Sequence, residues 1–227
     1  MARVVEHGTD GAILVLPDEN FAHLEELRRQ GIPVALVDDR GESPPVVPSV
    51  GSTNFAGGFA ATEHLLSLGH RRIAVVSGPP YKSTRARIAG YRTALQEAGI
   101  TPDPGLERPG RFVTETGYEA ARALLDTPEP PTAIFAGNDL QALGVYRALY
   151  EAGLRTPDDM SVIGFDDLPL AGLLTPALTT VRQPVREMGA LATRMLLRLI
   201  AGEKLESTRV ELATSLMVRE SSAPPRA

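Results

Sequence analysis

Alternation of short apolar runs with amphipathic stretches is the feature of this sequence that most constrains its fold. The runs are apolar almost throughout, whereas a strand with one wet face would alternate apolar and polar residues. Continuous apolar runs are typical of parallel strands buried on both faces of a sheet. The pattern therefore predicts an α/β fold with parallel sheets and right-handed crossover connections. The strands are expected at residues 11–16, 33–37, 72–76, 132–135 and 161–165.

Glycines mark the ends of four predicted helices. Each follows an amphipathic stretch and occupies the position where a helix commonly ends in a left-handed residue, which glycine adopts at least cost. These glycines are Gly31, Gly69, Gly99 and Gly153. A further helix is predicted over residues 185–200, where methionine and leucine recur at helical spacing; this stripe is expected to be core.

Composition limits the class of protein. The chain has 227 residues, of which 43% are hydrophobic, enough for one domain or two small lobes. With 23 basic and 28 acidic side chains, it lacks the basic excess of a surface that grips nucleic acid. Cysteine is absent, which excludes disulfides and thiolate chemistry. Residues 1–8 lack the apolar segment of a signal peptide, and no apolar run has the length of a membrane span. A cytoplasmic protein without membrane contact is expected.

Polar side chains follow the predicted strands. Residues 38–40 (Asp-Asp-Arg), 137–139 (Gly-Asn-Asp) and 166–167 (Asp-Asp) come directly after strands, and Arg87 lies on the helix after the third strand. In an open α/β sheet, ligands bind outside the carboxyl ends of the strands. We therefore expect the binding site at this edge.

This rim suits a polyhydroxyl ligand. Carboxylates accept hydrogen bonds from sugar hydroxyls, an asparagine amide both donates and accepts, and an arginine offers a planar fork of donors. An aromatic ring would complete such a site by packing against the C–H face of the sugar. Phe55 and Phe112 are the candidates for that ring.

Each candidate also has a purely structural interpretation. Asn138 could cap the helix that follows it. Asp166 and Asp167 could be turn residues that bond their own backbone, and Arg87 could be a surface arginine. The set as a whole favours a site, because polar residues follow several strands at the same edge.

Seven segments lie in order along nearly the whole chain, at residues 9–17, 65–74, 85–91, 136–139, 161–167, 178–184 and 216–221. Together they resemble the signature motifs of the LacI family of bacterial transcription regulators. The resemblance implies a DNA-binding helix-turn-helix head, a hinge helix and a two-lobed core of the type I periplasmic-binding-protein fold. In that fold the cleft binds a small effector.

The resemblance also implies a domain organisation. Residues 1–69 with 182–210 would form an incomplete N-terminal lobe, and residues 70–181 with 211–227 the C-terminal lobe. Residues 1–8 resemble the end of the family's second core helix. The head, the hinge and the first strand–helix–strand of the lobe are therefore expected to be absent, which would expose a sheet edge to unwanted pairing. No recognition helix is then present to read a major groove.

Carried over residue by residue, the family's effector-binding positions fall near strand ends and helix starts. The chain has Thr53 where the family often has aspartate, a departure in the loop that carries two of these positions. The predicted effector-binding residues are Arg87, Asn138, Asp166, Phe112, Asn54 and Phe55.

The expected function is therefore that of the sugar-sensing core of a LacI-type regulator. It would have no cofactor and no metal, form a homodimer, and contact operator DNA only through the absent head. Effector binding would close the lobes by hinge motion near Gly69 and near residues 181–184. The alternative is a periplasmic sugar-binding protein, which would carry a signal peptide and lack the arginine-rich segment 69–72.

Enzymatic interpretations are weaker. Segment 78–84 resembles a phosphate-binding loop but lacks its second glycine, and its prolines supply no N–H groups. Asp38 and Asp39 could begin a magnesium phosphotransfer site, yet no lysine and hydroxyl follow at later strand ends. No pair of carboxylates has the spacing of a glycosidase. His70 precedes a strand and is expected to be structural. The chain is not expected to be an enzyme.

Overall fold

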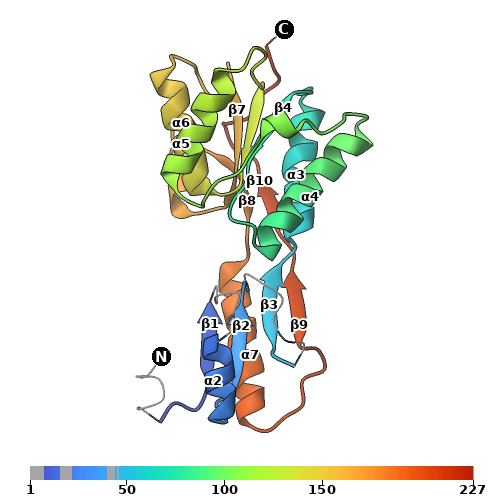
Figure 1. Ribbon diagram of the computed structural model, residues 1–227, viewed down its shortest axis with the longest axis vertical. Coiled ribbons are helices and arrows are strands. Elements are labelled where there is room, and N and C mark those ends of the chain that lie inside the picture. The colour runs from blue at the N-terminus through green and yellow to red at the C-terminus, as the bar shows by residue number, and fades with distance from the viewer. Residues whose placement is uncertain (1–7, 16–21, 40–43, 45, 227) are drawn as a thin grey trace. The chain divides into compact units, whose positions relative to one another are not determined.

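The computed structural model describes residues 8–15, 22–39, 44 and 46–226. The chain forms two compact units, each with its own sheet (Figure 1). The first comprises residues 1–53 and 184–213, and the second comprises residues 54–183 and 214–227. Both sheets are mainly parallel and are covered by helices, so the predicted α/β class is confirmed.

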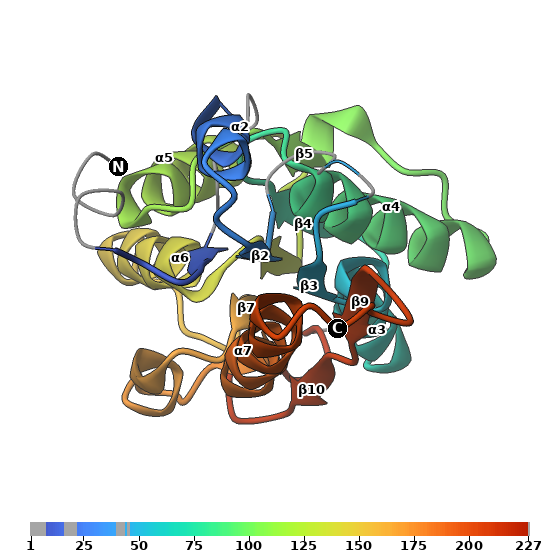
Figure 2. The same ribbon diagram turned by 90° about the horizontal axis from the view of Figure 1, so that it is seen from below.

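The first unit is a four-stranded parallel sheet with the order β1-β2-β3-β9. Helices α2 and α7 lie on opposite faces of this sheet (Figure 2). Its elements are β1 (Ala12–Val15), α2 (Ala22–Arg29), β2 (Val34–Val37), β3 (Ser49–Ser52), α7 (Val185–Ile200) and β9 (Arg209–Leu212).

Strand β2 lies inside this unit and serves two small cores. Val34 and Leu36 pack with two buried leucines of α2, whereas Ala35 and Val37 pack with the buried stripe of α7. All four residues of the strand are buried. Neighbouring residues of a strand point to opposite faces, so a strand with helices on both sides must be apolar throughout.

Strand β1 differs from the prediction of burial on both faces. It lies at the edge of the sheet and its burial alternates, with Ile13 and Val15 exposed. Its sequence has the same apolar character as the interior strands, so sequence alone did not distinguish an edge from a centre. Leu16, the last residue of the predicted strand, lies outside the described residues.

The second unit is a six-stranded sheet with the order β10-β8-β7-β6-β4-β5. All neighbours are parallel except the antiparallel pair β10 and β8. Its elements are α3 (Asn54–Ser67), β4 (Ile73–Val76), α4 (Lys82–Glu97), η1 (Pro104–Leu106), β5 (Glu107–Arg108), α5 (Thr114–Leu125), β6 (Ala133–Ala136), α6 (Asp139–Glu151), β7 (Ser161–Asp166), η2 (Pro169–Gly172), β8 (Thr179–Arg182) and β10 (Ser215–Met217).

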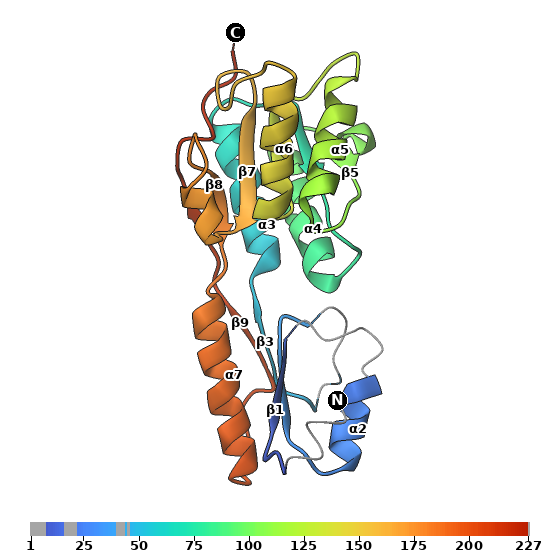
Figure 3. The ribbon, with the colours of Figure 1, turned by 90° about the vertical axis from the view of Figure 1, so that its left-hand side faces the viewer.

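Two helical layers cover this sheet. Helices α3 and α4 pack on one face and α5 and α6 on the other (Figures 1 and 3). Within β4, Ile73 and Val75 belong to the core beneath α3 and α4, while Ala74 and Val76 belong to the core beneath α5 and α6. The central strands are therefore buried on both faces, as their continuous apolar runs predict.

The glycines expected to end helices do so. Gly31, Gly69, Gly99 and Gly153 all have positive φ, at 72°, 97°, 71° and 72°. Helix α7 covers the predicted residues 185–200. The short strands β3, β5, β8, β9 and β10 were not predicted as strands.

The boundary between the units differs from the predicted lobes. Residues 54–69 were assigned to the first lobe, but α3 packs along α4 and belongs to the second unit. The chain passes between units after residues 53, 183 and 213. The predicted hinge near residues 181–184 coincides with one of these passages, whereas Gly69 lies inside the second unit. No helix in the described part of the chain is long and apolar enough to cross a membrane.

Candidate functional site

Arg87 is the centre of a polar cluster at the carboxyl end of the six-stranded sheet. Its side chain is buried, and the residue is only 5% exposed. Its Nε donates to Oδ1 of Asn54 at 2.8 Å, and its Nη1 donates to the carbonyl of Gly137 at 2.6 Å. Its Nη2 lies 3.8 Å from Oδ1 of Asp166. One buried arginine thus connects α3, the end of β6 and the end of β7.

Aromatic rings flank the Arg87 guanidinium. Its central carbon lies 3.6 Å from the ring centre of Phe165 and 5.6 Å from that of Phe112. A cation over an aromatic face is attracted by the ring's quadrupole, more strongly when both are desolvated. These contacts hold the guanidinium plane in a fixed orientation. The interpretation of Arg87 as a surface residue is therefore wrong.

Two glycines bring Asn54 to Arg87. A side-chain carbon on Gly58 of α3 would lie 2.2 Å from the carbonyl oxygen of Arg87, and one on Gly90 of α4 would lie 2.2 Å from that of Phe55. Both distances are impossible for real atoms, so only glycine permits this backbone-to-backbone approach. The close packing of α3 on α4 places the first residue of α3, Asn54, beside the guanidinium.

Asp166 ends β7 in an unusual backbone conformation. Its φ is 109°, and that of Asp167 is 58°, a region that residues other than glycine rarely occupy. Oδ1 of Asp166 accepts a hydrogen bond from Nε2 of Gln183 at 2.7 Å. Asp166 is the last residue of β7 and Asp167 follows it, and the turn of the chain at these residues brings Asp166 to the Arg87 cluster.

Asp167 fastens this turn to neighbouring segments. Its carboxylate pairs with Arg182 on β8 and with Arg219, each at 2.6 Å, and its side chain is 7% exposed. Burial opposes the ionised form, but the hydrogen bonds and charges of the two arginines outweigh it. They hold the pKa of Asp167 below its usual range.

Asn138 caps α6, as its structural interpretation predicted. Its Oδ1 accepts from the backbone N–H of Gln141 at 2.9 Å, and its Nδ2 reaches the carbonyl of Phe112 at 3.5 Å. The ring of Phe112 lies against the backbone at Gly78, where an added side-chain carbon would meet it at 2.2 Å. The cap and the ring therefore border the same strand ends as Arg87.

Phe55 is the predicted residue that contributes least to this cluster. It is 45% exposed, and its ring stacks with Phe59 at a centroid distance of 6.5 Å. Arg87, Asn54, Asp166, Asn138 and Phe112 are brought together in the second unit, whereas the ring of Phe55 pairs along its own helix.

Asp38 and Asp39 belong to the other unit, where they follow β2. Asp38 has a φ of 52°, and its N–H donates to the carbonyl of Val50 at 2.9 Å. Arg40, predicted with them, lies outside the described residues. In the described ranges, no group of three histidine, aspartate or glutamate side chains converges as metal ligands would.

Sequence reasoning missed two members of the cluster and one buried hydroxyl on the helix that carries Arg87. Gln183 lies in a segment quoted only as a family motif, and Phe165 was assigned solely to a buried strand. Thr84, one helical turn before Arg87, is buried, and its hydroxyl has no hydrogen-bond partner in the part of the chain that the structure describes. The one signal that could have identified Thr84 is its spacing of three residues from Arg87 on a helix.

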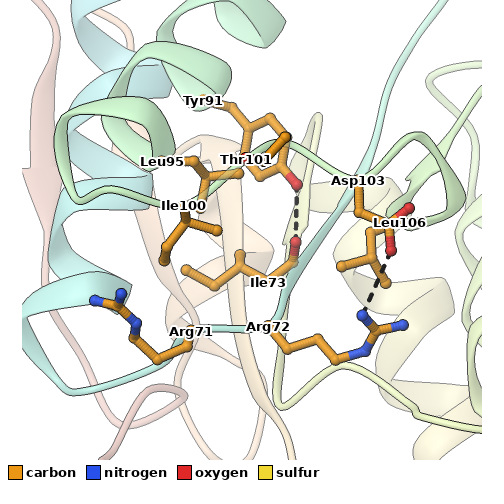
Figure 4. Close-up of a pocket in the computed structure, with 9 residues that line it drawn as sticks. All are labelled: Arg71, Arg72, Ile73, Tyr91, Leu95, Ile100, Thr101, Asp103 and Leu106. Atoms are coloured by element: carbon orange, nitrogen blue, oxygen red, sulfur yellow. Dashed lines mark hydrogen bonds and ion pairs between the residues drawn. The ribbon is translucent and has the colours of Figure 1, made fainter.

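A small cavity lies at the opposite, amino end of the sheet (Figure 4). Its volume is about 100 Å³, and Arg72, Ile73, Tyr91 and Asp103 help to line it. The hydroxyl of Tyr91 donates to the carbonyl of Ile73 at 2.8 Å, and Arg72 pairs with Asp103 at 3.4 Å. These polar groups satisfy one another, and the cavity lies at the start of β4, whereas Arg87 lies beside the carboxyl ends of the strands.

This chain is similar to known proteins in both sequence and structure. Residues 62–222 match the periplasmic binding protein-like domain. The ribose operon repressor of Escherichia coli strain K12 is 37% identical over 220 residues, which are 96% of this chain and 67% of the repressor. The chain thus spans about two thirds of the length of this curated relative.

Solved structures of transcription regulators are also similar to this chain. A LacI family transcriptional regulator from Enterococcus faecium with bound ribose superimposes with a TM-score of 0.90 at 35% identity, covering 99% of this chain and 84% of that one. The lac repressor dimer bound to operator and an anti-inducer gives a TM-score of 0.85 at 29% identity, covering 98% of this chain and 77% of that one.

Proposed function

The chain belongs to the LacI family of transcription regulators, and from this premise we propose that it is the effector-binding core of such a regulator, with a small sugar as effector. The family membership agrees with the resemblance of the sequence motifs. The proposed ligand rests on the chemistry of the second unit, where a buried arginine, a carboxylate and aromatic rings meet.

The proposal rests on the distance between the Arg87 guanidinium and the Asp166 carboxylate. Their closest atoms are 3.8 Å apart, longer than a direct hydrogen bond. A sugar hydroxyl both donates and accepts, so it can accept from the guanidinium and donate to the carboxylate at once. The ring of Phe112 offers an apolar face to the C–H groups of the same sugar.

Burial gives these polar groups their value for recognition. Arg87 is already held by Asn54 and Gly137 before a ligand arrives, so little side-chain entropy is lost on binding. A sugar lacking the matching hydroxyl would form fewer hydrogen bonds with these desolvated charged groups and would therefore bind more weakly. The site is thus suited to select among sugars.

Two relatives give the first ligand to test. The Enterococcus faecium neighbour holds ribose, and the Escherichia coli relative is named for the ribose operon. Ribose is therefore our first probe for this chain, followed by other pentoses, hexoses and disaccharides.

We further propose that the intact protein acts as a homodimer on operator DNA, in the cytoplasm. Support comes from the lac repressor neighbour, which is a dimer bound to operator. Tyr150 and Leu173 of the second unit expose large apolar surfaces, 84% and 82% of each residue. We propose that they lie in the interface between protein copies. Its test is the oligomeric state by analytical ultracentrifugation.

Calorimetric titration of the purified chain with ribose tests the sugar proposal. The parent should bind, and Asp166→Asn should bind at least tenfold more weakly, because a charged acceptor becomes a neutral amide. Arg147→Gln, an exposed arginine on α6, is the matched control and should bind as the parent does. A parent that melts cooperatively yet binds no sugar of the panel would overturn the proposal.

A further inference from the structure

Asp139 is a buried carboxyl group directly beneath the turn that carries Asp166. It is the first residue of α6 and is fully buried. Its Oδ2 accepts a hydrogen bond from the backbone N–H of Leu168 at 2.7 Å, and its Oδ1 accepts from the hydroxyl of Thr180 on β8 at 2.6 Å. One carboxyl group thus connects a helix, a strand and the turn after β7.

The packing around Asp139 leaves it little freedom. A side-chain carbon on Gly164 of β7 would lie 2.3 Å from Oδ1 of Asp139, so glycine is needed for the carboxyl group to lie against this strand. The carboxyl group is therefore fixed in position near the carboxyl end of β7.

The backbone conformation of the turn that Asp139 contacts must be stabilised by neighbouring residues. Asp166 and Asp167 are consecutive residues with positive φ, a conformation that side chains with a Cβ disfavour. Such a conformation persists only when surrounding contacts fix it. Asp167 is fixed by Arg182 and Arg219 on one side of the turn. On the other side, Asp139 holds the N–H of Leu168.

We propose that Asp139 is a positioning residue for the effector: it holds the turn 166–168 so that the Asp166 carboxylate faces Arg87. The role rests on the effector site proposed above. Asp139 does not need to touch the sugar. Its effect reaches the ligand through the backbone of the turn.

The ionisation of Asp139 gives this role a signature. Burial raises the pKa of Asp139 to about 7; the hydrogen bonds from Thr180 and Leu168 oppose this rise, and the charges of Asp166 and Asp167 add to it. The charged groups around it are those two aspartates on the turn, Arg182 of β8 and Arg219, which pair with Asp167, and Arg87 of α4, which faces Asp166.

Ionised Asp139 accepts more strongly from an N–H group than the neutral acid does. The hold on Leu168 should therefore tighten as the pH rises through neutrality. Ribose affinity of the parent should increase at least threefold from pH 6 to pH 8.

Hydrogen exchange of the whole chain tests the hold without any ligand. At pH 7.5, amides of residues 166–168 should exchange at least tenfold faster in Asp139→Ala than in the parent, with Asp126→Asn, an exposed carboxyl group, as the matched control. Thr180→Val removes only the supporting hydroxyl and should give a smaller increase in the same direction. Unchanged exchange at the turn in a folded Asp139→Ala or Thr180→Val chain would overturn the inference.

Calorimetry with ribose at pH 6 and pH 8 tests the consequence for binding. Asp139→Asn should bind at least tenfold more weakly and lose the pH dependence. An Asp139→Asn chain that keeps the parent's affinity and pH profile would contradict the positioning role. Failure of the parent to bind ribose or any sugar of the panel would instead refute the proposed function, and the exchange measurement would still decide whether Asp139 holds the turn.

Discussion

The two ends of the six-stranded sheet differ in the kind of buried polar group that they contain. At the amino end, His70 lies beneath the strands in a network of neutral groups. Its Nδ1 is 2.8 Å from the hydroxyl of Thr132, and its Nε2 is 2.9 Å from the carbonyl of Ala223 and 3.1 Å from the hydroxyl of Ser161. At the carboxyl end, the buried group is the charged Arg87, surrounded by a carboxylate and aromatic rings.

The difference distinguishes a structural hydrogen-bond network at the amino end from a proposed binding site at the carboxyl end. The His70 network joins residues next to β4, β6 and β7 to the C-terminal segment, and every partner is supplied by the chain. At the other end, the turn of Asp166 and Asp167 is held with positive φ, and the ion pair is too long for a direct hydrogen bond. Strain and charge concentrate where a ligand is expected, as is common at functional sites.

The largest expected effect follows from removing the charge at the carboxyl end. Arg87→Met keeps much of the side-chain volume but removes the donors to Asn54 and Gly137. We expect sugar affinity to fall by at least a hundredfold, equivalent to about 2.7 kcal/mol, because the ligand and Asp166 both lose the cation. Calorimetric titration measures the loss. An Arg87→Met chain that folds and binds as the parent does would remove the distinction between the two ends.

Disrupting the amino end should affect stability instead of binding. His70→Ala leaves Ser161, Thr132 and the carbonyl of Ala223 without their shared partner. The free energy of unfolding should fall by about 3 kcal/mol, the expected cost of a broken buried network. Urea unfolding measures this cost, and calorimetry on the folded variant should give an affinity within threefold of the parent's. A large loss of affinity without loss of stability would contradict the assignment.

The two ends should also respond to pH with opposite sign. Burial lowers the pKa of His70 and of His64, so their contribution to stability is complete above the unfolded value of 6.5 and is lost as the pH falls below it. Burial raises the pKa of Asp139 from 3.8 to about 7. Its contribution is complete below 3.8 and is lost as the pH rises toward 7.

Single substitutions separate these opposing trends. Between pH 5.5 and 7, stability should rise more steeply with pH in Asp139→Asn and less steeply in His70→Gln, each by about 1 kcal/mol per pH unit or less. Urea unfolding at several pH values measures the slopes. Equal slopes in the parent and both variants would show that neither group titrates as described.

The smallest effect is expected at an exposed pair outside both ends. Arg147 and Glu151 on α6 pair at 2.9 Å, with side chains 66% and 36% exposed. Arg147→Gln should change the free energy of unfolding by less than about 0.5 kcal/mol, because solvent screens such pairs. Thermal unfolding checks this value. A loss as large as that of His70→Ala would mean that burial does not govern these differences.

The sequence predicted most helices and strands of the molecule because periodicity and glycine positions are local signals. Strand β4 was predicted within one residue at its start, and Gly69 was correctly placed at the end of a helix. The expectation that β1 is buried on both faces was wrong because its residues do not differ in kind from those of β4. Helix α3 was assigned to the wrong unit because its packing on α4 depends on the Gly58 and Gly90 contacts, which adjoin only in three dimensions.

The candidate site was predicted in part for the same reason. Asn138 and Asp166 follow strands, so topology alone brings them to one edge. Gly137 contributes a backbone carbonyl, which leaves no trace in the sequence, and Gln183 lies 17 residues from its partner Asp166. The ring of Phe165 was assigned correctly to a buried strand, but its second role beneath Arg87 depends on the rotamer of that arginine.

Amide chemical shifts can show at which end of the six-stranded sheet a sugar binds. The isotopically labelled chain would be titrated with ribose, or with whichever sugar of the panel binds. We expect saturable shifts at Asn54, Gly137 and Asp166, with Thr132 and Ser161 unchanged. Saturable shifts at the amino end that leave Asn54, Gly137 and Asp166 unmoved would show that the charged cluster is not the binding site.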